Sequence, residues 1–142
     1  MATGTGDRLK RAKRLVTVQE QMRRTAEIAL TATRERLGEI EADRARLLAA
    51  LASSDHGPML LEATAKRLRG LAAQATALES EAAAQAEAVR ERGLAQKRAE
   101  SLAERRADDH RRETERRDDL ERLDGQVARA SARTGRPGTS LP

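Results

Sequence analysis

Apolar residues recur with a seven-residue period through the first third of the chain. Counted from the first leucine, the a positions of this repeat are Leu9, Val16, Arg23, Leu30, Leu37, Arg44 and Leu51, and five of these seven are large and apolar. The d positions are Ala12, Gln19, Ala26, Thr33, Ile40 and Leu47. A repeat that continues over six heptads is typical of a coiled-coil seam. We therefore expect a helix over residues 7–53, with Asp7 as its N-cap.

The segment Ser53-Ser54-Asp55-His56-Gly57-Pro58 interrupts this pattern. Clustered Ser, Asp, Gly and Pro are typical of a turn, and Pro is favoured in the first turn of a following helix. A connection this short, over residues 54–58, requires the next helix to fold back antiparallel to the first.

The seven-residue pattern resumes after the turn, and we expect a second helix over residues 59–130. Its a positions are Leu61, Leu68, Ala75, Ala82 and Val89, and its d positions are Thr64, Leu71, Leu78 and Gln85. The sequence thus predicts an all-α fold in which two long helices form an antiparallel coiled-coil hairpin. The second helix is predicted to be longer than the first.

The second helix is also predicted to extend beyond its partner. Ala107 is the only apolar residue between residues 104 and 119, so the apolar stripe stops where the first helix, folded about residue 56, has ended. We expect residues 104–130 to overhang the pair, and ion pairs along the helix to stabilise them in water. The predicted pairs are Asp108–Arg112, Glu113–Arg117, Asp118–Arg122, Arg105–Asp109 and Arg111–Glu115. Residues 1–6 and 131–142 are expected to be disordered tails.

The composition favours long helices and disfavours a thick core. The chain has no Phe, Tyr, Trp or Cys, and 36% of its residues are charged, with the two signs interleaved. Compact cores are normally anchored by aromatic side chains, which bury about 150–250 Å² each. The absence of cysteine excludes disulfides and thiolate metal sites. No apolar run approaches the roughly 20 residues needed to cross a bilayer, and residues 1–6 are not a hydrophobic signal segment, so we expect a cytoplasmic location.

The sequence contains no recognisable catalytic constellation. A nucleophile needs a nearby base, and the chain has only two histidines, His56 in the turn and His110 in the charged stretch. We expect both to be ordinary solvated side chains. Arginines beside the acidic pairs at 108–109 and 118–119 favour ion pairs over a divalent cation. We therefore expect no enzymatic activity, cofactor, metal or small-molecule substrate.

A basic run at the start of the first helix is one of two candidate contact surfaces. It consists of Arg8, Lys10, Arg11, Lys13 and Arg14, with a single acid, Asp7, nearby. A solvated helix face is one interpretation. Binding to an acidic protein surface, a membrane or nucleic acid are the others. The chain lacks the aromatic side chains on which bases stack, which disfavours nucleic acid. The apolar neighbours of the basic run are needed in the seam, which disfavours a membrane. An acidic protein is therefore the favoured partner among these three.

The second candidate surface is formed by Leu120, Leu123 and Val127, which are spaced three and four residues apart. In the predicted overhang these residues have no partner within the chain. They form either a minor fold-back contact, a dimer seam, or a set of apolar anchors for a partner protein.

The chain resembles the FliJ family of flagellar type III export stalk proteins, whose architecture is shared by the YscO-like proteins of injectisomes. The resemblance covers residues 7–130 and includes the basic opening of the first helix at residues 8–11, the fold-back before mid-chain, the longer second helix and the ending at residues 117–124. It implies a cytoplasmic stalk, peripheral at the inner membrane, that inserts into the export ATPase ring and contacts the export gate. On this resemblance we expect a monomer or weak oligomer.

The resemblance also implies which residues contact the ATPase ring, namely those near the two helix termini. In this sequence the candidates are Leu9, Arg11, Arg14, Val16, Leu120, Leu123 and Val127. Gate contacts in the family often use aromatic residues, which this chain lacks, so no gate-contact residue is assigned. Two other functions stay open at this point: a generic coiled-coil scaffold or dimerisation protein, and a basic helical protein that binds nucleic acid or anionic lipid.

Overall fold

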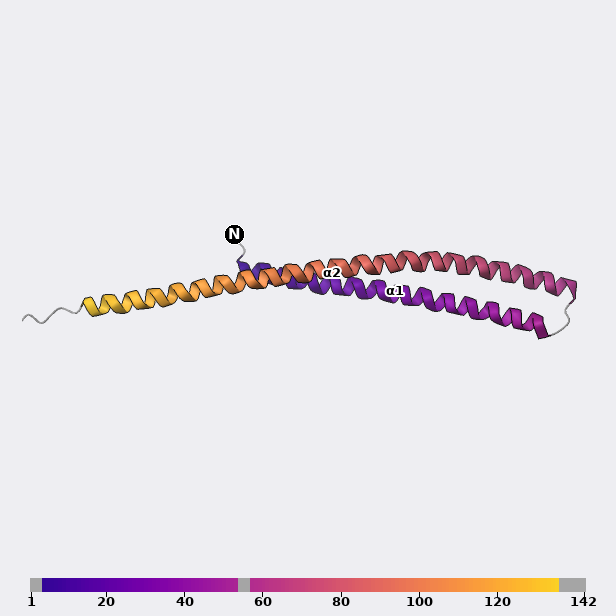
Figure 1. The fold of residues 1–142 in the computed structure, drawn as a ribbon, viewed down its shortest axis with the longest axis horizontal. Helices are drawn as coiled ribbons and strands as arrows, with labels where there is room; N and C mark the ends of the chain where they lie inside the picture. The colour runs from indigo at the N-terminus through magenta and orange to yellow at the C-terminus, as the bar shows by residue number, and fades with distance from the viewer. Residues whose placement is uncertain (1–3, 54–56, 136–142) are drawn as a thin grey trace, which may run out of the picture. The chain divides into compact units, whose positions relative to one another are not determined.

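The structure, a computed structural model, describes residues 4–53 and 57–135, and over these residues it consists of two α-helices (Figure 1). Helix α1 spans Thr5–Ser53 and helix α2 spans Pro58–Thr134. The predicted all-α hairpin with a longer second helix is confirmed. Predictions for the remaining residues, which are 1–3, 54–56 and 136–142, lie outside the described part of the chain.

Helix α1 begins earlier than predicted. The carbonyl of Gly4 accepts hydrogen bonds from the backbone N–H groups of Asp7 and Arg8, at 3.1 and 3.2 Å. Gly4 therefore occupies the capping position, and Asp7 lies in the first turn, where its carboxylate faces the positive end of the helix dipole. The prediction of a disordered tail is wrong for residues 4–6, because these residues begin the helix.

Helix α2 begins at Pro58, one residue earlier than predicted, and it ends later than predicted. The carbonyl of Gly57 accepts hydrogen bonds from Leu60 and Leu61, both at 3.1 Å. At the other end the helix continues through Thr134, and the N–H of Gly135 donates to the carbonyl of Ser131 at 2.8 Å. Residues 131–134 are thus helical, since Ser, Ala and Arg there permit α2 to continue.

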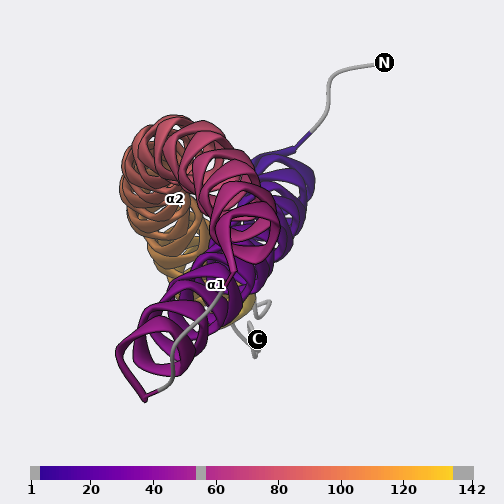
Figure 2. The same ribbon diagram turned by 90° about the vertical axis from the view of Figure 1, so that its right-hand side faces the viewer.

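The chain divides into two units, and each contains a segment of both helices. We call residues 17–98 the turn unit, and residues 1–16 with 99–142 the terminal unit. Figure 2 looks at the turn unit from the end where the helices are joined, and shows α1 and α2 as two coils lying beside each other.

The core of the turn unit lies along the predicted seam. Its buried side chains are Leu30, Thr33, Leu71, Ala75 and Leu78, all at a or d positions. Every a and d position of α1 from residue 9 to 51 is buried or half-buried, so the predicted register of α1 is confirmed.

The seam of α2 begins later than predicted. Leu61 is 47% exposed, and its neighbours Met59 and Leu60 are exposed as well. Figure 1 shows the two ribbons of the turn unit diverging toward the turn, which explains why these apolar side chains stay uncovered. Thr64 is the first half-buried seam residue of α2.

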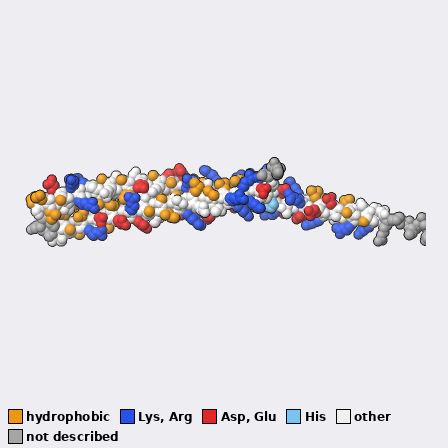
Figure 3. Space-filling view, turned by 180° about the vertical axis from the view of Figure 1, so that it is seen from behind, with side chains coloured by type: hydrophobic (Ala, Val, Ile, Leu, Met, Phe, Trp, Pro, Cys, Tyr) orange, Lys and Arg blue, Asp and Glu red, His pale blue; other side chains and the backbone are white. Residues whose placement is uncertain are grey.

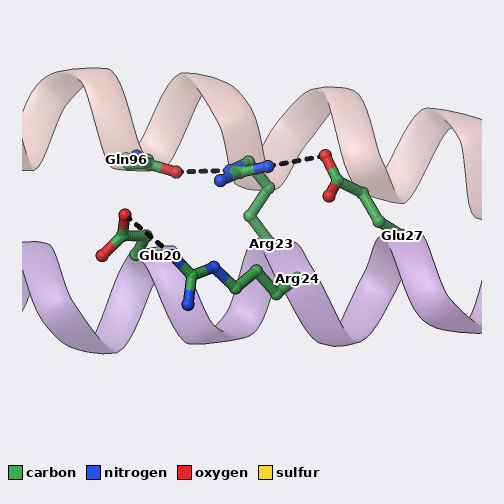
Figure 4. Close-up of polar contacts among 5 residues, drawn as sticks. All are labelled: Glu20, Arg23, Arg24, Glu27 and Gln96. Carbon is green, nitrogen blue, oxygen red and sulfur yellow. Dashed lines mark hydrogen bonds and ion pairs between the residues drawn. The ribbon is translucent and has the colours of Figure 1, made fainter.

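A polar layer interrupts the apolar seam of the turn unit (Figure 4). Arg23, at an a position, donates from Nε to Oε1 of Gln96 on α2 at 2.6 Å, and from Nη1 to Glu27 on its own helix at 2.6 Å. Because only one alignment of the helices brings these two side chains together, the pair helps to fix the register.

Candidate protein-contact surface

A hydroxyl group joins the start of α1 to α2 in the terminal unit. The Oγ1 of Thr5 donates a hydrogen bond to the carboxylate of Glu113 and lies 3.1 Å from Nδ1 of His110. A hydroxyl carries a single hydrogen, so Nδ1–H of His110 is the donor in the second bond. We call these three residues the Thr5 clamp. It attaches the first turn of α1 to α2 by hydrogen bonds.

The Thr5 clamp means that the pairing of the helices extends further than predicted. Residues 104–113 of α2 do not overhang, because Arg106, His110 and Glu113 are half-buried. The prediction is wrong for these residues because it counted only apolar side chains as seam members, whereas polar ones extend the seam here. Among the described residues from 114 onwards, every one except Gly125 is exposed.

The Thr5 clamp also changes the acidity of Glu113. Its pKa lies below the ordinary value, chiefly because the Thr5 hydroxyl donates a hydrogen bond to the charged carboxylate. Desolvation opposes this shift, while the charge and hydrogen bond of Arg117, 3.0 Å away, add to it.

Five arginines of the terminal unit line two grooves between α1 and α2. The first groove is lined by Arg8, Arg11 and Arg106 together with the apolar Ala12, Leu15 and Leu102. The second groove has Arg8, Arg112 and Arg116 beside Thr5, Asp109 and Glu113. Arg8 belongs to both, so the grooves adjoin, and we call the five arginines the arginine cluster. Figure 3 shows Lys and Arg side chains gathered beside the histidine drawn in pale blue.

The arginine cluster has no ion-pair partner among the described residues. Within the part of the chain that the structure describes, none of its five guanidinium groups forms an ion pair with a carboxylate. A guanidinium offers five N–H donors in a planar fork that suits carboxylates. This surface therefore has unused capacity to bind an acidic partner.

Four of the five ion pairs predicted along α2 do not form among the described residues. Glu113–Arg117 forms as predicted. Asp108, however, pairs with Arg111 and leaves Arg112 unpaired, and Arg122 pairs with Asp119 at 3.6 Å. The predictions of Asp108–Arg112, Asp118–Arg122, Arg105–Asp109 and Arg111–Glu115 are therefore wrong for the described residues. Partners three residues apart compete with those four apart, and the sequence did not decide between them.

The predicted ATPase-contact residues lie in different environments. Leu9 and Val16 are half-buried in the seam, and Arg11 and Arg14 are exposed. Arg11 belongs to the arginine cluster. The three apolar candidates on the unpaired stretch of α2 are exposed: Leu120 by 60%, Leu123 by 55% and Val127 by 63%.

Sequence reasoning missed three members of the arginine cluster: Arg106, Arg112 and Arg116. Their proximity to Arg8 and Arg11 depends on how far α1 extends along α2, which the apolar pattern alone did not show. The seven-residue period carried past residue 103 would have placed Arg106, His110 and Glu113 at seam positions.

The described residues hold no group of three or more His, Cys, Asp and Glu side chains arranged to bind a metal ion. Neither α1 nor α2, over the residues described, is long and apolar enough to cross a membrane. Comparison of the chain with protein-family models, curated proteins and solved structures found no match.

Proposed function

We propose that this chain is a non-enzymatic coiled-coil stalk of a flagellar or related type III protein export apparatus. It acts at the cytoplasmic face of the inner membrane, contacts the export ATPase ring and the export gate, and couples ATP hydrolysis to export by contact alone. The resemblance described above and the two-helix hairpin support this proposal. No cofactor or small-molecule substrate is required.

The arginine cluster is the observation that carries the proposal. Five guanidinium groups from two helices line the two adjoining grooves. None of them forms an ion pair with a described carboxylate, so an acidic partner can bind them without first displacing such a pair. Hydrogen bonds between guanidinium and carboxylate groups are stronger than neutral ones, and charge complementarity also accelerates association.

The apolar candidates add specificity to this charged surface. Leu120, Leu123 and Val127 recur at three- and four-residue spacing on a stretch of α2 whose described residues have no cover. Residues with this spacing act as anchors when a helix enters an apolar groove. A ring lined with acidic residues and an apolar sleeve would bind both parts of the terminal unit.

Contact alone is sufficient for coupling. A stalk that binds one conformation of a ring subunit better than another shifts that subunit toward the first conformation, by an amount set by the difference in affinity. An asymmetric pair of helices contacts the subunits of a ring unequally. The stalk thereby changes which subunit hydrolyses ATP without contributing a catalytic group.

The test is binding to the export ATPase of the same organism, with ATPase stimulation as a second readout. Arg112→Gln with Arg116→Gln removes two unpaired charges. The matched control, Arg46→Gln with Arg90→Gln, removes two arginines that pair with Asp43 and Glu87 on their own helices. We expect binding to weaken about tenfold or more in the first variant and to change little in the second. Equal loss in both variants, or no binding by the unaltered chain, would contradict the proposal.

A scaffold that dimerises through α2 is the second candidate function, and the exposure of Leu120 and Val127 favours it. In that case, Leu120→Asp with Val127→Asp would convert a stable dimer to a monomer in sedimentation measurements. A chain that is monomeric before the change excludes this function.

A further inference from the structure

The two grooves of the terminal unit differ in the charges that line them. In the first groove every charged lining residue is an arginine, namely Arg8, Arg11 and Arg106. In the second groove Asp109 and Glu113 lie among the arginines and reduce its net positive charge. The first groove therefore presents the more positive surface to a partner, although Arg8 belongs to both grooves.

The first groove is basic at one end and apolar at the other. On α1, Leu15 lies two turns beyond Arg8, or about 10 Å along the helix, and on α2 Leu102 precedes Arg106 by one turn, or about 6 Å. The Thr5 clamp and the lining of this groove show that the two helices run antiparallel here, so both leucines lie toward one end and the arginines toward the other. Leu15 is 40% exposed, so the described residues leave the apolar end partly uncovered.

We propose that the first groove binds an acidic amphipathic helix of a partner protein. One apolar side chain of that helix packs on Leu15 and Leu102, and carboxylates one to two turns away bind the three arginines of the groove. Apolar anchors on one face of a helix are the usual means by which a helix binds in a groove. The inference rests on the proposed function, because it takes the arginine cluster as a protein-contact surface, and it adds what the partner must present there.

The exposure of Leu15 favours a protein partner over one that carries phosphate groups. A free phosphate or a nucleic-acid backbone would satisfy the guanidinium groups but would leave Leu15 without an apolar contact. The chain also has no aromatic side chain on which a base could stack. An acidic amphipathic helix meets both requirements, because its carboxylates match the planar guanidinium groups and its apolar side chain covers the leucine.

Fluorescence anisotropy of a labelled peptide tests the proposal on the full-length chain. The probe is a synthetic peptide of about 20 residues, long enough to form a helix, with glutamates one and two turns from a single leucine. Arg11→Gln with Arg106→Gln should weaken its binding at least about tenfold. The matched control, Arg105→Gln with Arg133→Gln, lowers the net charge equally at exposed positions that line neither groove, and it should weaken binding less than about twofold. Equal losses in the two variants would overturn the proposal.

A change in the peptide tests the apolar contact without altering the fold of the chain. Replacing the leucine of the peptide with alanine should weaken its binding to the unaltered chain about fivefold. The same replacement should have little effect on binding to Leu15→Ala, because the contact is already removed there. An affinity of the unaltered chain that is the same for both peptides would overturn the proposed role of the apolar end.

Other occupants of the first groove give different results. Tighter binding of a single-stranded oligonucleotide than of the peptide, or self-association of the chain, would overturn the proposal if Arg11→Gln with Arg106→Gln abolishes it. Absence of peptide binding up to about 1 mM, the weak end of measurable affinity, would also overturn it. The proposed function is tested separately with the export ATPase: binding of the ATPase without the peptide contradicts only this inference, and binding of the peptide without the ATPase contradicts only the proposed function.

Discussion

The turn unit and the terminal unit join the same two helices in different ways. In the turn unit, Leu30, Leu71 and Leu78 are buried, and Arg23 with Gln96 adds one polar layer. In the terminal unit, the buried apolar residues among those described are Ala12 and Ala99, and hydrogen bonds of the Thr5 clamp make the outermost contact.

The turn unit therefore contributes most of the stability, whereas the terminal unit carries the arginine cluster. Burial of a leucine side chain contributes about 1.5–3 kcal/mol, whereas a hydrogen bond contributes about 0.5–1.5 kcal/mol net. The turn unit is held mainly by the larger of these contributions. The terminal unit has little apolar burial among its described residues, and its arginine cluster forms no ion pair with a described carboxylate.

Truncation of the most deeply buried leucine should cause the largest loss in the free energy of unfolding. Leu71 is 1% exposed, so Leu71→Ala should lower the free energy of unfolding by about 2–4 kcal/mol, from lost burial and from the cavity left behind. Leu120→Ala, at an exposed position of the terminal unit, should change it by less than about 0.5 kcal/mol. Urea unfolding followed by circular dichroism measures both. Equal losses would mean that the two units do not differ as described.

Replacing Gln85 of the turn unit, whose amide oxygen is buried, should raise the stability instead of lowering it. The Oε1 of Gln85 is buried and has no hydrogen-bond partner among the described residues, and Gln85 occupies a d position of the seam. An unsatisfied buried acceptor costs about 1–3 kcal/mol, so Gln85→Leu should raise the free energy of unfolding by about 1–2 kcal/mol. Gln126→Leu, an exposed glutamine of the terminal unit, serves as the control. A loss of stability in Gln85→Leu would refute the interpretation of this site.

The fold class and the register of α1 could be predicted from the sequence because each rests on a repeated local pattern. The heptad positions from Leu9 to Leu51 and the proline that opens α2 are of this kind. The burial of Leu61 was predicted incorrectly, because the exposure of a side chain near a turn depends on how far the two helices diverge there. That divergence leaves no periodic signal.

The arginine cluster could be predicted only in part, for a related physical reason. The basic run containing Arg8 and Arg11 was apparent from the sequence, but Arg106, Arg112 and Arg116 join it only because the Thr5 clamp extends the pairing to Glu113. Hydrogen bonds between polar side chains far apart in sequence have no periodicity. The competition of Arg111 and Arg112 for Asp108 is decided by side-chain geometry within a single turn.

The Arg23–Gln96 layer should couple the two helices of the turn unit by a smaller amount. A double-mutant cycle with Arg23→Met and Gln96→Ala should give a coupling energy of about 0.5–1.5 kcal/mol, because the pair shares a single hydrogen bond and the Arg23 side chain is partly exposed to water. The cycle Arg24→Met with Gln96→Ala is the control, because Arg24 binds Glu20 on its own helix. Zero coupling in the first cycle would show that this layer does not stabilise the pairing of the two helices.

The Thr5 clamp should have the smallest effect, and it should depend on pH. The folded-state pKa of Glu113 is lower than its ordinary value of about 4.5, so its contribution to stability is present above that pH and is lost as the pH falls through the folded-state pKa. Thr5→Val removes the main cause and should move the Glu113 pKa upward, as measured by NMR titration of its carboxyl carbon. Thr114→Val is the matched control, because that hydroxyl bonds the His110 carbonyl of its own helix at 2.9 Å. An unchanged Glu113 pKa in Thr5→Val would mean that the start of α1 is not attached to α2 through this hydroxyl, and the contrast between the two units would then rest on apolar burial alone.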